Sequence, residues 1–544
     1  MKLLWLDLNS SYAHSSLALP ALHAQLANHA SITWEVVSAT INENCGMVVN
    51  NIYHQQPDII AATVWLFNHE QLLHIVSRAK ALLPHCTIIL GGPEFLGDNE
   101  AFLRKNPFVN CVFRGEGEAA FPLWLDAWNR PNAWNNITGL CYLDNINQYQ
   151  DNGLARVLDF DQLASPEESP FFNWSKPFVQ LETTRGCFNT CAFCVSGGEK
   201  PIRTINMTTV RRRLTEIHRQ GIKNVRVLDR TFNYDNKRAK ELLSLFLEFS
   251  PDICFHLEIH PALISEELKQ ELVKTPHGLL HLEAGIQSLR EEVLVQSRRM
   301  GKLSKALEGL QFLCSLSQME THADLIAGLP LYRLSEIFED IHILAAYGAD
   351  EIQLESLKLL PGTEMRRRAE ELGIQYSPLP PYEVLQTREI TVDELQTARY
   401  LSRLLDGFYN TPTWRGVTRS CLLKDSTFLT ALLAHLVELG LIDQPLSMEK
   451  RGLILYEFCK THYPDFQSAV SIAWIEAGMS LKKLPAERVK TKRQLPPDTW
   501  QVLYGEYKET LRLCFLPTDG EKGYWFGFES EEQTIKPVFK ATNR

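Results

Sequence analysis

Hydrophobic and polar positions follow two repeating patterns along the first two thirds of the chain. Within residues 1–135, short apolar runs rich in branched and aromatic side chains alternate with segments of helical spacing. The runs predicted to be strands are 2–8, 33–39, 58–65, 86–92 and 110–116. The predicted helices between them are 17–29, 69–83 and 117–128. Strands that alternate with helices predict a parallel, doubly wound sheet with helices on both faces.

A second alternation of strands and helices begins near residue 177. The predicted strands are 177–183, 224–230, 254–260, 279–287, 319–328 and 351–360. The predicted helices around them are 207–220, 236–249, 265–275, 290–297, 303–317 and 333–347. A six-fold strand–helix repeat predicts an open, partial β/α barrel, whose active face is formed by the loops that follow the strands.

The remaining segments do not continue these repeats. Residues 136–176 are rich in Asn, Asp, Ser and Pro, which predicts a linker. Beyond the barrel we expect a mostly helical region, with helices at 392–410, 426–440 and 449–460 and a late hairpin at 511–530. The predicted domains are therefore 1–135, the linker 136–176, the barrel 177–385 and a C-terminal domain 386–544.

Composition adds few constraints to this α/β architecture. Apolar residues make up 45 % and charged residues 22 % of the chain, which is ordinary for a globular protein. The formal net charge of −10 argues against a protein that coats nucleic acid. We find no secretory hydrophobic segment and no apolar run long enough to cross a membrane, so we expect a cytoplasmic protein.

The chain's unusual chemistry lies in three of its 12 cysteines. Cys187, Cys191 and Cys194 form a C-x3-C-x2-C run directly after the first predicted barrel strand. Structural zinc usually takes two paired elements, and a 4Fe–4S cluster normally takes four thiolates. Three thiolates would leave one iron open, so the spacing predicts a cluster with one exchangeable position. The alternative is a zinc site completed by a distant Cys or His.

This run, with Phe193 before its last cysteine, resembles the motif of the radical SAM superfamily. The segments 282–288 (LEAGIQS), 324–330 (DLIAGLP) and 357–365 (LKLLPGTEM) are similar to later strands of that superfamily. The resemblance implies that the three cysteines ligate a 4Fe–4S cluster and that S-adenosylmethionine (SAM) binds the open iron. Reductive cleavage of SAM to a 5′-deoxyadenosyl radical would follow, and this is the cofactors' own chemistry.

The resemblance also implies a set of SAM-binding side chains. Besides Phe193, they are Glu283, Gln287 and Ser288 near the ribose, and Gly328 beside the adenine. Many relatives carry a Gly-Gly-Glu run for the SAM amino group, and here residues 228–233 (LDRTFN) stand in its place. Asp229 and Asn233 are therefore candidates for that role. Asp229 could instead be a strand-end carboxylate that caps the next helix.

The first domain resembles the cobalamin-binding branch of the superfamily. The similar segments are 61–69 (AATVWLFNH), 89–95 (ILGGPEF) and 112–121 (VFRGEGEAAF). The resemblance implies that Gly91 and Gly92 admit the nucleotide tail of cobalamin and that Gly115 and Glu116 bind the cofactor. Alternatively, the glycines serve only as turns without a ligand.

One cobalamin motif is missing from this chain. The D-x-H-x-x-G run, which supplies a histidine to cobalt in many cobalamin proteins, does not occur. The nearest candidates, Asp7 and His14, have the wrong spacing and no following glycine. We therefore expect base-off cobalamin without a histidine on cobalt.

Residues 8–19, 230–233 and 354–365 resemble a subgroup that joins these two domains to a C-terminal region called DUF4080. The reaction implied is methylation of an unactivated carbon, with a flavodoxin- or ferredoxin-type electron donor. The alternatives are a cobalamin-dependent rearrangement or cyclisation, RNA modification, or a non-catalytic cobalamin or electron-transfer module. A basic stretch at 481–493 followed by Trp500, Tyr504 and Tyr507 keeps nucleic acid open as a partner, although the acidic net charge does not favour it.

Overall fold

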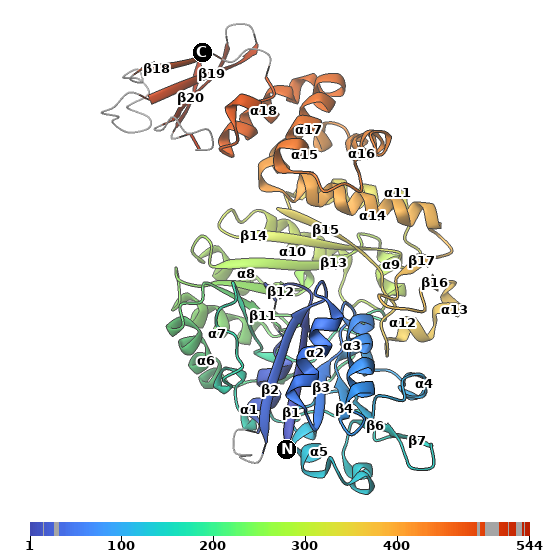
Figure 1. The fold of residues 1–544 in the computed structure, drawn as a ribbon. Coiled ribbons are helices and arrows are strands. Elements are labelled where there is room, and N and C mark those ends of the chain that lie inside the picture. Colours follow the sequence, from blue (N-terminus) through green and yellow to red (C-terminus); the bar gives the residue numbers. More distant parts are fainter. Residues whose placement is uncertain are drawn as a thin grey trace. The chain divides into compact units, whose positions relative to one another are not determined.

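The computed structural model describes residues 1–14, 16–26, 32–486, 490–494, 511–519, 522–528, 536–537 and 539–543. These residues form two compact units. The first unit comprises Met1–Thr321, Ile326–Arg333 and Ser356–Leu395. The second comprises His322–Leu325, Leu334–Glu355 and Gln396–Arg544. Figure 1 labels most of these elements, and its colours follow the chain from the N-terminus to the C-terminus.

The first domain is built on a seven-stranded sheet of order β2-β1-β3-β4-β5-β6-β7. Its five parallel strands are β1 (Lys2–Asn9), β2 (Thr33–Thr40), β3 (Ile59–Thr63), β4 (Thr87–Gly91) and β5 (Cys111–Phe113). Its helices are α1 (Ala18–Ala24), α2 (Cys45–Gln55), α3 (His69–Leu82), α4 (Glu100–Lys105) and α5 (Ala120–Ala127). The order and the parallel pairing confirm the predicted doubly wound sheet.

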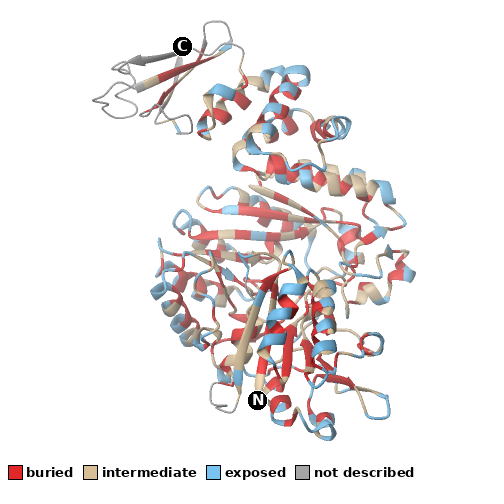
Figure 2. Ribbon diagram, in the orientation of Figure 1, coloured by how far each residue is buried: buried red, intermediate tan, exposed pale blue. Residues whose placement is uncertain are grey.

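Side chains on β1 explain why this sheet is covered on both faces. Leu4 and Leu6 are buried in a core shared with α2 and α3, which Figure 1 shows over the near face. Leu3 and Trp5 are buried in a second core with α1 and α5. Successive residues of a strand point to opposite faces, so an unbroken apolar run fills both cores. Figure 2 shows buried residues along the strands of this sheet.

The segment predicted as a linker contains two strands. β6 (Leu140–Leu143) pairs antiparallel with β5, and β7 (Tyr149–Asp151) pairs antiparallel with β6, so both extend the first sheet. Their apolar and polar pattern spans only four and three residues, too short to stand out among the Asn and Asp residues around it. The prediction of an irregular linker over 136–176 was therefore wrong for these strands.

The central domain carries a six-stranded sheet of order β15-β14-β13-β12-β11-β8. The strands are β8 (Val179–Leu181), β11 (Asn224–Val227), β12 (Cys254–Ile259), β13 (Leu280–Gln287), β14 (Glu320–Ala327) and β15 (Glu351–Ser356). The helices are α6 (Met207–Arg219), α7 (Asn236–Leu247), α8 (Glu266–Val273), α9 (Glu291–Gln296), α10 (Leu303–Cys314) and α11 (Leu334–Tyr347). Each lies where the sequence predicts it, and the partial barrel is confirmed.

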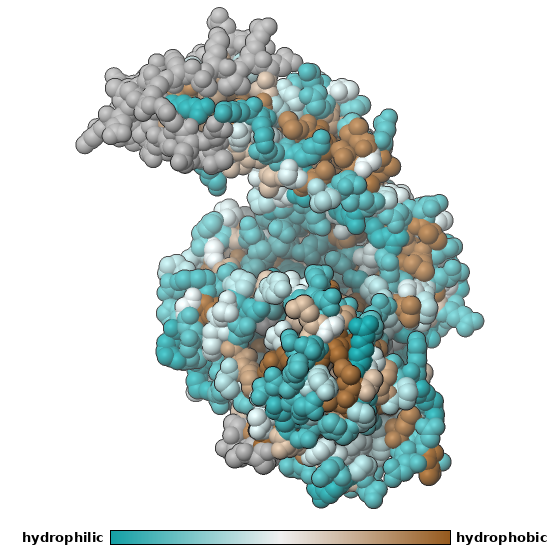
Figure 3. All heavy atoms as spheres, viewed as in Figure 1, coloured by the Kyte–Doolittle hydropathy of each residue, from teal (hydrophilic) through white to brown (hydrophobic). Residues whose placement is uncertain are grey.

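One face of this second sheet is polar and open. Buried apolar residues such as Val225, Phe255 and Leu282 alternate with polar ones along β11, β12 and β13. The side with the polar residues is called the open face below; it carries Arg226, His256, Glu258, His281 and Glu283. Arg226 and Glu283 are exposed although β11 and β13 are interior strands. Figure 3 shows hydrophilic residues gathered over β13.

The C-terminal region is helical and ends in a small sheet. Its helices are α14 (Val392–Leu404), α15 (Pro412–Lys424), α16 (Phe428–Glu438), α17 (Met448–His462) and α18 (Gln467–Glu476). The sheet contains β18 (Lys490–Gln494), β19 (Leu511–Asp519), β20 (Lys522–Phe528) and β21 (Phe539–Asn543). The antiparallel pair β19–β20 is the predicted late hairpin, whereas α15 and α18 were not predicted.

Two further observations concern this region. Within the described ranges no single helix is long and apolar enough to span a membrane. Taken together, α15 and α16 have enough apolar length, but they are bent by 117° relative to one another. Trp500, Tyr504 and Tyr507, on which the nucleic-acid alternative depends, lie outside the described residues together with residues 487–489.

Candidate functional site

The three clustered cysteines lie on one loop between β9 (Thr184–Arg185) and β10 (Arg203–Thr204), and residues 186–199 are called the cysteine loop below. All three thiols are free. The loop closes on itself through its backbone: the Cys194 N–H donates to the Cys191 carbonyl at 3.2 Å, and the Cys187 N–H donates to the Glu199 carbonyl at 3.0 Å. These backbone hydrogen bonds help to fix the conformation of the loop.

Segments far away in the sequence hold the cysteine loop in place. The Ala192 N–H donates to the Ser297 carbonyl at 2.9 Å, and the Met300 N–H donates to Asn189 Oδ1, also at 2.9 Å. A Cβ atom on Gly197 would lie 2.3 Å from the Cys191 carbonyl oxygen, so glycine is needed there. The connection between α9 and α10 thus fixes where the thiols lie.

Arg299 is a site residue that the sequence pattern did not single out. Its Nη1 lies 3.7 Å from Cys191 Sγ, and its Nη2 donates to the Gly285 carbonyl on β13. Burial raises the pKa of the Cys191 thiol, and the Arg299 guanidinium opposes that shift. The only signal in the sequence was a pair of arginines directly after the predicted helix 290–297. The structure makes this cation a neighbour of both the thiols and β13.

The end of β13 brings two of the predicted ribose residues to the open face. Glu283 and Gln287 lie four positions apart on one strand, so their side chains leave the same face. Gln287 has φ of 74°, a left-handed conformation that costs a non-glycine residue on the order of 1 kcal/mol or more. Ser288 is fully buried, and its hydroxyl accepts the Arg290 N–H at 3.1 Å.

The side chains of Asp229 and Asn233 already have partners within the protein. Asp229 is buried and accepts the N–H groups of Thr183 and Thr184, each at 2.8 Å. Asn233 is buried and bonds both the carbonyl and the N–H of His260. Asp235, rather than Asp229, caps the following helix α7. The SAM-binding role of both residues stays a prediction, and the structure gives each a structural task.

The other two positions assigned to SAM have different surroundings. Phe193 is half-buried on the cysteine loop. Gly328 has φ of 91°, and a Cβ atom there would meet no atom closer than 3.5 Å. The left-handed backbone, rather than a tight contact, therefore requires glycine at this strand end.

On the open face, the protein surroundings shift the pKa values of a glutamate and a histidine. Glu258 is in register with Glu283 on the neighbouring strand. Burial raises the pKa of Glu258 to about 7; Arg230 opposes the shift and Glu283 adds to it. Burial, together with His281 and Arg226, lowers the pKa of His256 to about 4, so this imidazole is neutral at neutral pH.

The glycines of the first domain differ in what requires them. A Cβ atom on Gly92 would lie 2.5 Å from the Val64 carbonyl oxygen, and one on Gly115 would lie 2.3 Å from that of Ala155. Gly91 would meet only Phe113 Cβ at 3.8 Å, so it leaves free space. Of these three glycines, only Gly91 lies where the absence of a side chain would leave space for a ligand.

Glu116, also predicted to bind cobalamin, lies in a network of ion pairs. Its carboxylate is 2.8 Å from Arg203 Nη2 and 3.5 Å from Arg185 Nη1. It also accepts the Val157 N–H at 2.5 Å. Arg185 and Arg203 flank the cysteine loop, so Glu116 connects the first domain to that loop. Its cofactor role stays a prediction.

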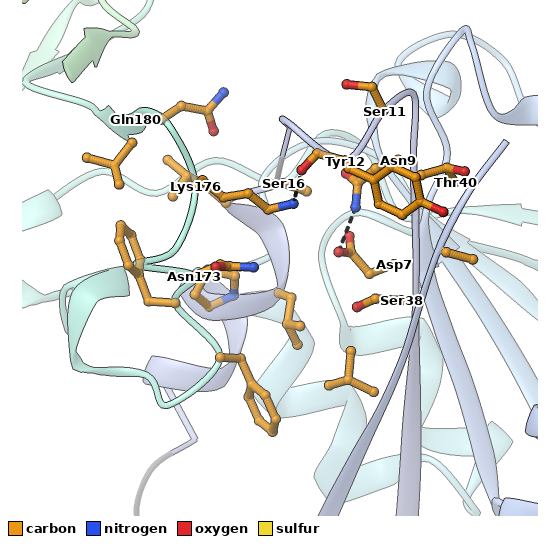
Figure 4. A pocket seen from close by; sticks show the side chains of 18 of the residues that line it. Asp7, Asn9, Ser11, Tyr12, Ser16, Ser38, Thr40, Asn173, Lys176 and Gln180 are labelled. Carbon is orange, nitrogen blue, oxygen red and sulfur yellow. Dashed lines mark hydrogen bonds between the residues drawn. The ribbon is translucent and has the colours of Figure 1, made fainter. Parts of the chain in front are cut away.

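A cavity of about 230 Å³ lies at the C-terminal ends of β1 and β2 (Figure 4). Asn9 donates to Asp7 at 2.8 Å, and burial raises the pKa of Asp7. Lys176 donates to the Tyr12 carbonyl across the mouth of the cavity. Gln180 on β8 also lines the cavity, which therefore extends from the edge of the first sheet to the first strand of the second.

Exposed aromatic rings flank the same edge of the first sheet. Tyr12, after β1, is 75 % exposed, and Phe67, after β3, is 45 % exposed. Phe67 stacks on Trp65 with ring centroids 6.5 Å apart. Ligands of doubly wound sheets bind outside the carboxyl ends of the strands. Apolar rings beside a polar cavity fit a large, flat cofactor with polar side groups, such as cobalamin.

Three family models match consecutive parts of the chain. The B12 binding domain matches residues 6–124, and the radical SAM superfamily matches residues 181–343. The third, DUF4080, a protein family of unknown function, matches residues 370–471. The first two matches cover the sheet edge and the cysteine loop described above.

Individual relatives agree with these matches. An uncharacterized methyltransferase of Pyrococcus horikoshii is 24 % identical over 57 % of this chain and 68 % of its own length. The cobalamin-dependent radical SAM methyltransferase TokK of Streptomyces tokunonensis is 21 % identical over 60 % of this chain, which spans about half of that relative (51 %).

A solved structure shares the fold at low sequence identity. The cobalamin-dependent SAM radical enzyme OxsB, with aqua-cobalamin and S-adenosylmethionine bound, superposes with a TM-score of 0.60 at 14 % identity, over 87 % of this chain and 78 % of that one. The fold, the cysteine loop and the three family matches agree. The chain is a radical SAM protein with an N-terminal B12-binding domain and a C-terminal DUF4080 region.

Proposed function

We propose that this protein methylates an unactivated carbon of its substrate, using a 4Fe–4S cluster, SAM and cobalamin. The observation that carries the proposal is the cavity of Figure 4, which joins the edge of the first sheet to β8 of the barrel within one compact unit. A cofactor at that edge would lie next to a substrate on the open face. The name of the relative TokK supports the same reaction class.

The chain's own residues would divide the work as follows. Cys187, Cys191 and Cys194 would hold the cluster, and Arg299 would place a positive charge beside it. Glu283 and Gln287 would position SAM at the end of β13. Bound there, the cofactors would supply a carbon-centred radical that removes a substrate hydrogen and a methyl group that replaces it.

We propose that cobalamin binds base-off without a histidine on cobalt. His14, the nearest histidine after β1, has its Nδ1 2.8 Å from Ser11 Oγ. Its ring meets Phe178 edge-on with centroids 5.6 Å apart. The exposed imidazole of His14 thus already has two contacts within the protein. A base-on spectrum of the bound cofactor would contradict this part of the proposal.

The test begins with anaerobic purification, cluster reconstitution and addition of hydroxocobalamin. We expect about four irons and one cobalt per chain. With reductant and SAM carrying a deuterated methyl group, methyl transfer yields equal amounts of 5′-deoxyadenosine and S-adenosylhomocysteine. A rearrangement or cyclisation yields 5′-deoxyadenosine without S-adenosylhomocysteine. That product ratio separates the proposal from its first alternative.

A matched pair of variants tests the cluster assignment. Cys191→Ala should abolish SAM cleavage while cobalt content stays at the wild-type level. Cys314→Ala, on the outer helix α10, should behave as wild type. Continued formation of 5′-deoxyadenosine by the Cys191 variant would rule out the assignment, and loss of iron from both variants would show that the effect is not specific.

A further inference from the structure

The open face carries an arginine that forms no ion pair with any acid among the described residues. Arg226 is exposed on the interior strand β11, and its guanidinium lies over the ring of Phe178, 4.0 Å from the centroid. Among the described residues it makes no hydrogen bond or ion pair. An exposed guanidinium without an ion pair keeps its N–H donors available to a ligand carboxylate or phosphate, which it can bind through two parallel hydrogen bonds.

The register of the strands gives this arginine uncharged neighbours. Arg226 is aligned with Gln180 on β8 and with His256 on β12, and His256 is aligned with His281 on β13. The two imidazoles stack with centroids 4.3 Å apart. His256 is neutral, and His281 is paired with Glu320 at 3.2 Å. One row across the open face therefore combines a free guanidinium with amide and imidazole donors.

The carboxyl groups near this row do not cancel its charge. Glu258 and Glu283 lie two residues further along their strands. The surrounding protein desolvates both carboxyl groups, Glu283 included although its side chain still reaches solvent, and this raises the pKa of each. The nearest acids thus favour their neutral forms more than solvated carboxyls do. Arg226 opposes the shift at Glu283 without forming an ion pair with it, so its guanidinium keeps its donors for an anion.

We propose that Arg226, with Gln180 and His256, binds a carboxylate or phosphate group of the substrate. This inference rests on the proposed function, because it names the substrate class of the same site. His281 and Gln287 lie six positions apart on β13, which is about 20 Å along an extended strand. An anion bound by Arg226 would therefore leave about 20 Å along the strands for the rest of the substrate, up to the position proposed for SAM near Gln287.

The first experiment uses the complete enzyme with its cluster, cobalamin, SAM and reductant. A metabolite extract of the source cells is divided on an anion-exchange column, and each fraction is added to the enzyme. The readout is the ratio of 5′-deoxyadenosine formed with and without each fraction. We expect the retained, anionic fraction to raise this ratio several-fold, and the unretained fraction to leave it near one.

Variants then place the effect at Arg226. In Arg226→Gln the ratio should fall to about one, and Arg226→Lys should recover part of it. Arg211→Gln, on the outer side of α6 where Arg211 pairs with Glu248, should keep the wild-type ratio. Stimulation by the unretained fraction, or full stimulation of Arg226→Gln, would overturn the proposal while the proposed methyl transfer stands.

Two controls distinguish a substrate anion from a cofactor phosphate and from an inactive enzyme. Loss of cobalt from Arg226→Gln would mean that the anion is the cobalamin phosphodiester, which also overturns the proposal. If wild type cleaves no SAM at all, the proposed function fails, and phenylglyoxal labelling still tests the anion site. Inorganic phosphate should then protect Arg226 more than Arg211 at constant ionic strength; equal protection would contradict the inference.

Discussion

At the scale of single residues, the surroundings on the open face shift the pKa of Glu258 toward neutral pH. Glu258 and Glu283 lie side by side on parallel strands, in surroundings that penalise two carboxylates. Burial is the larger cause of the raised pKa of Glu258, and Glu283 adds to it. A carboxyl with a pKa of about 7 links the stability of the barrel to pH near neutrality.

Replacing Glu258 with Gln should stabilise the protein at high pH alone. Between the ordinary pKa of 4.5 and the raised value of about 7, the folded state keeps a proton that the unfolded state has released. The free energy of unfolding therefore falls as pH rises through this window, by about 3 kcal/mol in total. Glu258→Gln should recover up to that amount at about pH 8 and almost nothing at about pH 4.5.

Urea unfolding of both proteins at the two pH values measures this difference. Glu248→Gln is the matched control, since Glu248 is an exposed acid whose pKa Arg211 lowers. It should show no gain at high pH. A gain for Glu258→Gln of the same size at both pH values would contradict the pKa explanation.

At the scale of elements, the cysteine loop depends on its backbone conformation. Three cysteines spaced for a cluster are useful only if the loop turns their sulfurs to one place. Backbone hydrogen bonds inside the loop and to the α9–α10 connection provide that turn. Gly197 lies where no side chain fits.

Gly197→Ala should therefore impair cluster assembly without removing a ligand. The new methyl group would lie 2.3 Å from the Cys191 carbonyl oxygen, so the loop has to shift. We expect the iron content after reconstitution to fall from about four per chain to less than about one. Gly416→Ala, whose Cβ would meet nothing within 4 Å, should keep the full content. Normal iron in Gly197→Ala would show that the loop tolerates the shift.

At the scale of the whole molecule, ion pairs connect the first domain to the barrel within the first compact unit. Glu116 pairs with Arg203, and Glu118 pairs with Arg185 at 2.8 Å. The Arg203 side chain is only 6 % exposed. Breaking such a buried pair is costly, because Arg203 would keep only Glu199, at 2.7 Å, as an acidic partner.

Glu116→Gln should lower the free energy of unfolding by about 3 kcal/mol, as expected for a buried pair that loses one partner. Glu100→Gln, which breaks an exposed pair with Arg104, should cost less than about 1 kcal/mol. Thermal unfolding of the apoproteins compares the two. If Glu116→Gln loses cobalt without losing stability, the residue acts on the cofactor rather than on the domain contact.

Local sequence patterns predict much of this architecture. The strands β11, β12 and β13 alternate apolar and polar residues, and the helices between them have apolar stripes, so their positions follow from the sequence. The spacing of Cys187, Cys191 and Cys194 likewise predicts cluster chemistry without a structure. Short elements such as β6 and β7 escape prediction, because three or four residues carry too little periodicity.

The sequence by itself determined the order of domains, the alternation of strands and helices that predicts parallel sheets, and the three thiols, since each depends on neighbouring residues. Only the tertiary structure decided that Arg299 lies beside Cys191, 108 positions away in the chain. It also decided that Asp229 and Asn233 are used in backbone contacts and that Arg226 is left unpaired on the open face. Such relations depend on the register of distant strands, which no local pattern records.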